Sequence, residues 1–143
     1  MYNLKNLKIM RNLIPLLYIV FFSFKGISQT QAEMNAELQE SYNSSDEELN
    51  AVYQAIIREY KNDTIFLKAL RFSQRNWIKF RDSELKMKYP EREIRGYYGS
   101  VYPMCEASYL DELTKSRIKT LKVWLDGIEE GDVCSGSVKI ARE

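Results

Sequence analysis

The residues of this sequence that are best suited to chemistry are carboxylates and arginines on otherwise apolar helical faces. Asp82 and Glu84 stand close enough along the chain to suggest an acid–base pair. Against this, the sequence contains no histidine, which removes the commonest general base and the commonest metal ligand. Neighbouring charges are also common on solvated helix faces, and no nucleophile is paired with a base. The pattern therefore favours a non-enzymatic protein without a metal or cofactor over a small hydrolase that uses Asp or Glu.

Polar side chains also recur inside the apolar stripes at the three- and four-residue spacing of a helix. Burying an arginine or a carboxylate is unfavourable unless the group is paired and hydrogen-bonded. Arg81 and Arg117 therefore need acidic partners. Asp46, Asp82 and Glu84 are the candidates. One interpretation is a buried network that fixes the register of the helices, and the other is a catalytic or ligand-binding cleft. The predicted network consists of Asp46, Asn50, Gln74, Trp77, Arg81, Asp82, Thr114 and Arg117.

Three long helices are expected to position these groups. Proline is absent from residues 29–89 and glycine from residues 29–95, which favours long helices. The apolar periodicity predicts helices over about residues 31–60, 64–88 and 103–126. Long helices with short connections predict an all-α fold, an antiparallel up-down-up three-helix bundle.

Capping residues support these boundaries. Asp63 is a good N-cap for the second helix, and Pro90 ends it because proline disfavours helical backbone in the preceding residue. Gly127 suits the end of the third helix. In the first helix a capping box could begin at Ser45; a continuous helix is favoured, and a bend at Ser44 is the alternative. The predicted inner face of the third helix is Leu110, Leu113, Arg117, Leu121 and Trp124.

Residues 1–28 have the features of a secretory signal peptide. Lys5, Lys8 and Arg11 precede an apolar run over residues 13–24, shorter than the roughly 20 residues of a membrane-spanning helix. Small residues then favour cleavage before Gln29, and an uncleaved N-terminal anchor is the alternative. We therefore predict a secreted or periplasmic protein with no stable membrane insertion after cleavage.

The predicted mature chain has a small acidic surplus. Four of the 21 basic residues and none of the 20 acidic residues lie in the predicted signal, which leaves 17 basic and 20 acidic residues and a net charge of −3. A nucleic-acid-binding domain would normally show a basic surplus, so nucleic acid is not an expected partner. The length suits one domain. We predict a helical domain over residues 29–127 and an irregular tail over residues 128–143.

The polar residues also carry a resemblance to a known family. The segments MNAELQESYNSSDEELNAVY, LKALRFSQRNWIKFRDSE, GYYGS and SYLDELTKSRIKTL follow one another between Met34 and Leu121. In this order they resemble the LprI-type lysozyme inhibitor-like family. The resemblance implies an exported, largely helical, non-enzymatic protein with a protein partner, a lysozyme, and inhibition of lysozyme-type cell-wall hydrolases as its activity. A structural or envelope-interaction module without inhibitory activity is the alternative.

The chain departs from this family in its cysteines. Members often carry cysteines where Glu37 and Leu85 stand here, as if one disulfide had been removed. Cys105 and Cys134 remain, and an even pair in an exported chain predicts a disulfide. The helix from Cys105 to Asp126 spans about 31 Å, whereas the eight steps from Asp126 to Cys134 reach only about 26 Å. The bridge therefore requires Cys105 to precede the third helix proper and the tail to fold back along it; free or intermolecular thiols are the alternative.

The loop over residues 91–102 is the predicted binding surface. Tyrosine and arginine are favoured in protein interfaces, and such side chains could hydrogen-bond to the catalytic carboxylates in a lysozyme cleft. The alternative is that the tyrosines of this loop cap the end of the bundle. The predicted contact residues are Arg92, Arg95, Tyr97, Tyr98 and Ser100.

Overall fold

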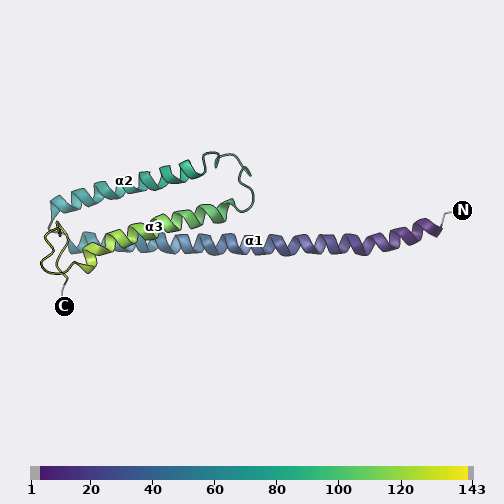
Figure 1. The fold of residues 1–143 in the computed structure, drawn as a ribbon, viewed down its shortest axis with the longest axis horizontal. Helices are drawn as coiled ribbons and strands as arrows, with labels where there is room; N and C mark the ends of the chain where they lie inside the picture. The colour runs from purple at the N-terminus through teal and green to yellow at the C-terminus, as the bar shows by residue number, and fades with distance from the viewer. Residues whose placement is uncertain (1–3, 142–143) are drawn as a thin grey trace.

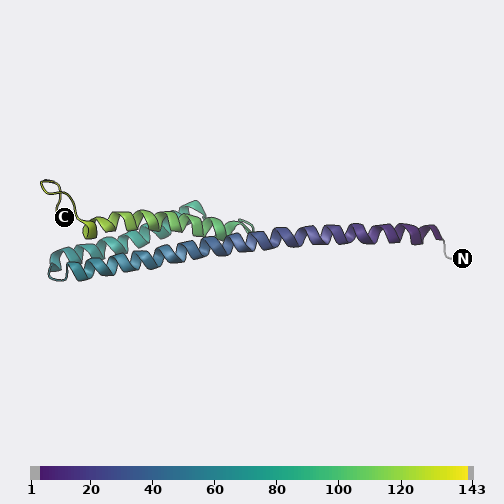
Figure 2. The same cartoon turned by 90° about the horizontal axis from the view of Figure 1, so that it is seen from below.

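The computed structural model describes the backbone of residues 4–141 and the side chains of residues 30–141. It contains three helices, α1 (Leu4–Glu59), α2 (Thr64–Lys88) and α3 (Tyr102–Asp126). Figures 1 and 2 show α2 running antiparallel to α1, and α3 lying beside α1 and running in the same direction as α1. The described residues form no strand, so the predicted all-α, up-down-up bundle is confirmed.

The N-terminal part of α1 extends past the rest of the bundle (Figure 1). The predicted signal peptide falls on this part, and its side chains lie outside the described residues, so its cleavage stays a prediction. If the signal is cleaved before Gln29, α1 of the mature chain begins about 9 Å before Asn35, measured along the helix axis. The Asn35 amide donates to the carbonyl of Ser100, in the loop that joins α2 to α3. Within the described residues, no helix combines the length and the hydropathy of a membrane span.

Small side chains let α1 and α3 approach closely, and α1 packs mainly against α3. On α3, Ala107 and Thr114 are 1% and 0% exposed, and Ser45 on α1 is 4% exposed. Larger apolar residues continue the contact toward the C-terminal ends of both helices. The buried apolar residues of α1 and α3 in this core are Leu49, Val52, Ile56, Ile118 and Leu121.

Asp111 is the polar centre of the contact between α1 and α3. Its buried carboxylate accepts hydrogen bonds from the hydroxyls of Ser41 (3.1 Å) and Ser45, and from the ammonium group of Lys115 (2.8 Å). Burial by itself would raise the pKa of this carboxyl, but the hydrogen bonds from Lys115, Ser45 and Ser41 hold the pKa below its ordinary value. Ser45 therefore bonds to α3 and does not cap a new helix, and α1 is continuous, as predicted.

The buried face of α3 differs from the predicted one. Leu110, Leu113 and Arg117 are only half-buried, although the prediction placed them on the inner face. The physical reason is that α3 has two neighbours: its small residues face α1, whereas Arg117 and Trp124 face α2. The buried residues of α3 are Ala107, Asp111, Thr114, Ile118 and Leu121.

α2 has the bounds that the sequence predicts, and large side chains separate it from α3. The carboxylate of Asp63 caps α2 by accepting from the backbone N–H of Phe66 (2.9 Å). The Phe66 ring lies 4.5 Å from the ring of Tyr60 and 6.1 Å from that of Trp124, measured between centroids. Because these rings hold α2 away from α3, polar groups and a pocket lie between the two helices.

The tail after α3 is irregular, as predicted, and it is anchored to the bundle. Gly127 ends α3 with a φ of 84°, and a Cβ at this position would lie 2.7 Å from the backbone of Ala141. Glycine is therefore required both by the turn and by the returning tail. The ammonium group of Lys139 pairs with Glu59 at 2.9 Å, and its backbone N–H donates to the hydroxyl of Tyr60 at 3.2 Å. The tail therefore covers the C-terminal end of α1.

We expect Asp111→Asn to lower the free energy of unfolding by about 1–3 kcal/mol at neutral pH, because three donors lose a charged, buried acceptor. Since the folded-state pKa of Asp111 is below its ordinary value of 3.8, the carboxylate stabilises the fold above that value. This stability is lost as the pH falls through the folded-state pKa. Urea unfolding of both proteins should therefore show their difference in stability shrinking below about pH 4.

The matched control is Glu112→Gln, which alters an exposed carboxylate next to Asp111. Its effect should stay within about 0.5 kcal/mol at every pH. A difference between the wild type and Asp111→Asn that is unchanged or larger in acid would contradict the assignment of Asp111.

Candidate functional site

Arg81, on α2, connects α2 to α1. Its guanidinium donates to the carboxylate of Asp82 at 2.9 and 3.0 Å, and lies 3.9 Å from the carboxylate of Asp46 on α1. The hydroxyl of Tyr42 accepts a longer contact at 3.5 Å. Burial raises the pKa of Tyr42, so this phenol stays neutral. Arg81 is therefore a half-buried cation, 18% exposed, with two anionic neighbours.

Arg117, on α3, connects α3 to α2 with neutral partners. Its Nε donates to Oε1 of Gln74 and its Nη2 to Oγ of Ser73, both at 3.0 Å. Burial lowers the pKa of the Arg117 guanidinium, although an arginine remains charged at neutral pH. The prediction of an acidic partner for Arg117 is wrong, because the register of α2 places Ser73 and Gln74 opposite it. Asp82 is tied to Arg81, two turns farther along α2.

Trp77 joins the two arginines. Its ring lies 5.5 Å from the guanidinium carbon of Arg81 and 5.9 Å from that of Arg117, both within the range of a cation–π interaction. Side chains from all three helices therefore meet in one place. We call this group the arginine–tryptophan cluster, and it consists of Asp46, Gln74, Trp77, Arg81 and Arg117.

Other residues of the predicted network lie at its edge or outside it. Asn50 is exposed and donates to Asp46 at 3.2 Å. Thr114 is fully buried on the face toward α1, and among the described side chains its hydroxyl alone is buried without a hydrogen-bond partner. Glu84 accepts from the hydroxyl of Tyr109 at 3.2 Å, away from both arginines. Asp82 and Glu84 therefore have different partners and do not converge on one point.

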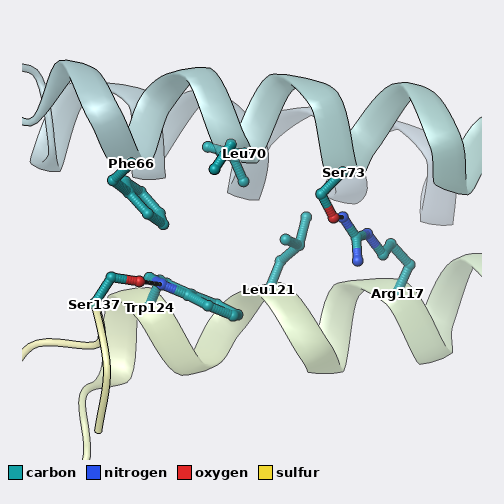
Figure 3. Close-up of a pocket in the computed structure, with 8 residues that line it drawn as sticks. Phe66, Leu70, Ser73, Arg117, Leu121, Trp124 and Ser137 are labelled. Atoms are coloured by element: carbon teal, nitrogen blue, oxygen red, sulfur yellow. Dashed lines mark hydrogen bonds between the residues drawn. The ribbon is translucent and has the colours of Figure 1, made fainter.

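A pocket of about 180 Å³ lies next to the cluster, between α2, α3 and the tail. Figure 3 shows Phe66 and Trp124 at one end of it, and Arg117 reaching toward Ser73 at the other end. At the tail side, Nε1 of Trp124 donates to Oγ of Ser137 at 3.1 Å. The residues that line the pocket are Phe66, Ala69, Leu70, Ser73, Arg117, Leu121, Trp124 and Ser137.

The loop between α2 and α3 has an anchored part. The Tyr98 ring lies 5.3 Å from the ring of Tyr89 and 5.5 Å from that of Tyr102, measured between centroids. Burial, together with a hydrogen bond to Glu106, raises the pKa of Tyr102 to about 12. The guanidinium of Arg92 pairs with Glu106 at 3.5 Å. Tyrosines therefore pack together at this end of the bundle, as one of the two interpretations of the loop expects.

The rest of the loop is exposed. Arg95 faces solvent, and Tyr97 is 60% exposed although its ring touches that of Tyr98. Ser100 is exposed, and its carbonyl is bonded to Asn35 on α1. Of the five predicted contact residues, Arg95 and Tyr97 are thus the two large side chains that are most available to a partner.

The predicted disulfide between Cys105 and Cys134 is not present, and both residues are free thiols. Cys105 lies inside α3, which begins at Tyr102, and the tail folds at the far end of that helix. Neither condition for the bridge is met, because the tail is held by Trp124 and Tyr60 and does not run back along α3.

Comparison with known proteins identifies the family of this chain. The family described as "Lysozyme inhibitor LprI" matches residues 25–121, which include α2, most of α3, the packed part of α1 and the loop. The chain belongs to the LprI family. It is also similar to an uncharacterized protein of Rhizobium meliloti (strain 1021), with 30% identity over 111 residues that cover 70% of this chain and 77% of that protein. No solved structure gives a significant match.

The match to the LprI family contains the whole arginine–tryptophan cluster, but it also contains residues whose contact the sequence patterns did not predict. Ser41, Ser45 and Asp111 form the polar contact between α1 and α3. A signal for them exists in the sequence: Ala107, Asp111 and Thr114 follow helical spacing with small or polar side chains only. Apolar periodicity does not reveal this contact between α1 and α3, because close helix contact selects for small side chains more than for apolar ones.

We expect Thr114→Val to raise the free energy of unfolding by about 1 kcal/mol, because a near-isosteric methyl group replaces a buried hydroxyl without a partner. Thermal or urea unfolding measures the change. Thr120→Val is the control, because Thr120 is an exposed β-branched residue of the same helix whose hydroxyl donates to Ser116. Destabilisation by Thr114→Val beyond that of the control would show that the Thr114 hydroxyl makes a stabilising contact.

Proposed function

We propose that this protein is an exported, non-enzymatic member of the LprI family that binds and inhibits lysozyme-type cell-wall hydrolases. The family match over residues 25–121 carries the proposal. The arrangement of the carboxylates supports its non-enzymatic part. Asp82 is bonded to Arg81, Glu84 to Tyr109, and Asp111 to donors of α1 and α3, so these groups act as acceptors within the fold.

We further propose that the loop between α2 and α3 contacts the hydrolase. The tyrosine packing and the Arg92–Glu106 ion pair hold the base of the loop, which reduces the entropy that binding would cost. Arg95 and Tyr97 project from this base, and arginine and tyrosine are the residue types that most often dominate binding energy. A glycosidase cleft carries a pair of carboxylates that could accept hydrogen bonds from such an arginine.

The test is lysis of bacterial cells by c-type, g-type and i-type lysozymes with purified mature protein in micromolar excess. We expect inhibition of at least one class. Arg95→Ala and Tyr97→Ala should each weaken it by about 30-fold or more, because truncating an interface hot spot costs about 2 kcal/mol or more. Lys119→Ala, an exposed cation on α3, is the control and should keep full potency.

Failure to inhibit any lysozyme class would discard the inhibitory function. Inhibition that both loop variants retain in full would keep the function and assign the contact to another surface.

A second candidate function is an envelope-interaction module, and the outer face of α2 favours it. Four large apolar side chains at spacings of seven and eight residues share this face. They are Ile65, Phe72, Phe80 and Met87, which are 84%, 61%, 50% and 70% exposed. A row of exposed cations flanks them, Lys68, Arg71, Arg75, Lys79 and Lys86. An apolar stripe beside a basic stripe is the pattern of helices that lie on anionic lipid surfaces.

We expect the protein to sediment with vesicles that contain anionic phosphatidylglycerol more than with vesicles of phosphatidylcholine alone. Phe72→Ser together with Phe80→Ser should reduce sedimentation at least about fivefold, because apolar burial supplies much of the binding energy. Val133→Ser, at an exposed valine of the tail, is the control. Equal binding to both vesicle types, or no binding, would exclude this function for α2.

A further inference from the structure

Arg117 is a half-buried cation whose charge is not balanced. No carboxylate of the described residues pairs with it, since its hydrogen bonds go to neutral Gln74 and Ser73. Arg81, which also lies against the ring of Trp77, differs in having two carboxylates beside it. A guanidinium has five N–H donors, and these hydrogen bonds use only two of them. Arg117 also lines the pocket, so its remaining donors are available to an anion there.

The pocket beside Arg117 determines which kind of anion would fit. Its lining contains no acidic side chain, and its far end is formed by the rings of Phe66 and Trp124. An anion with several charges would need more cations than the one arginine supplies. A fully polar ligand, such as a sugar, would leave the apolar walls without a partner. The lining therefore suits a ligand with one charge and an apolar body.

We propose that this pocket binds a small monocarboxylate with an aromatic or short aliphatic body. An apolar cavity of about 150 Å³ admits a benzene ring, so a volume of about 180 Å³ fits a ring with a carboxylate attached. The carboxylate would accept hydrogen bonds from the guanidinium of Arg117 and from the hydroxyl of Ser73. The apolar body would lie against Leu70, Leu121 and Trp124. This binding site is separate from the exposed loop and does not depend on lysozyme inhibition.

Titration of the purified protein with phenylacetate tests the proposal, with phenylacetamide as the neutral probe of the same shape. Binding is measured by calorimetry and by tryptophan fluorescence, because Trp124 lines the pocket and Trp77 contacts Arg117. We expect saturable binding of the acid, and affinity for the amide lower by about tenfold or more, because only the acid forms charge-assisted hydrogen bonds. Equal affinity for both probes, or no saturable signal with the acid at millimolar concentration, would overturn the proposal.

Two variants test whether phenylacetate binds in the pocket. Arg117→Gln should remove the preference for the acid, but it also changes the contact between α2 and α3. Ala69→Leu keeps Arg117 and narrows the pocket at its solvent-exposed side with a good helix former, so it should weaken binding by about tenfold or more while the circular dichroism spectrum stays unchanged. Arg71→Gln, which removes an exposed cation of the same helix, is the control and should bind phenylacetate as the wild type does. Unchanged affinity in folded Ala69→Leu would overturn the proposal.

Discussion

The close contact of α1 with α3 is the constraint on which the rest of the structure depends. Two helix backbones can approach closely only where the side chains between them are small, and Ser45, Ala107 and Thr114 meet this requirement. Asp111 then places a charge in the contact, and the two serines of α1 together with Lys115 satisfy it. The carboxylate can be buried only where these donors converge and give it hydrogen bonds. It therefore also fixes the register of α3 against α1.

The position of α2 follows from that contact. The small residues of α3 pack against α1. The remaining face of α3 therefore meets α2 through large and polar side chains such as Arg117 and Trp124. Such side chains do not interdigitate as densely as aliphatic ones. The space between α2 and α3 therefore contains hydrogen-bonded cations, a tryptophan between two arginines, and a pocket. The functional candidates lie along α2 and its loop because this is the loosely packed part of the bundle.

Much of the fold could be predicted because its signals are local. The N-cap at Asp63, the stop at Gly127 and the periodicity of α2 depend on residues within one or two turns. The cluster was predictable in part: Arg81 has the expected partners Asp46 and Asp82. Arg117 does not have its expected acidic partner. Its actual partners depend on how α2 is positioned along α3, and the residue spacing within one helix does not encode that position. Cys105 shows the same limit, since its distance from Cys134 depends on the path of the tail.

The sequence by itself determined the C-terminal end of α1 and both ends of α2 and α3 to within one residue, and which residues would be unfavourable to bury without partners, whereas α1 begins at Leu4 and not near residue 31 as predicted. These properties follow from backbone propensity, capping and side-chain chemistry, which act within a few residues. Only the tertiary structure decided that Thr114 faces α1 without a hydrogen-bond partner among the described residues, that the Asp111 carboxylate accepts from three donors, and that the described residues place no carboxylate beside Arg117 where it lines the pocket. The reason is that an α-helix has several faces. Only its packing against two neighbouring helices decides which of these faces each neighbour covers.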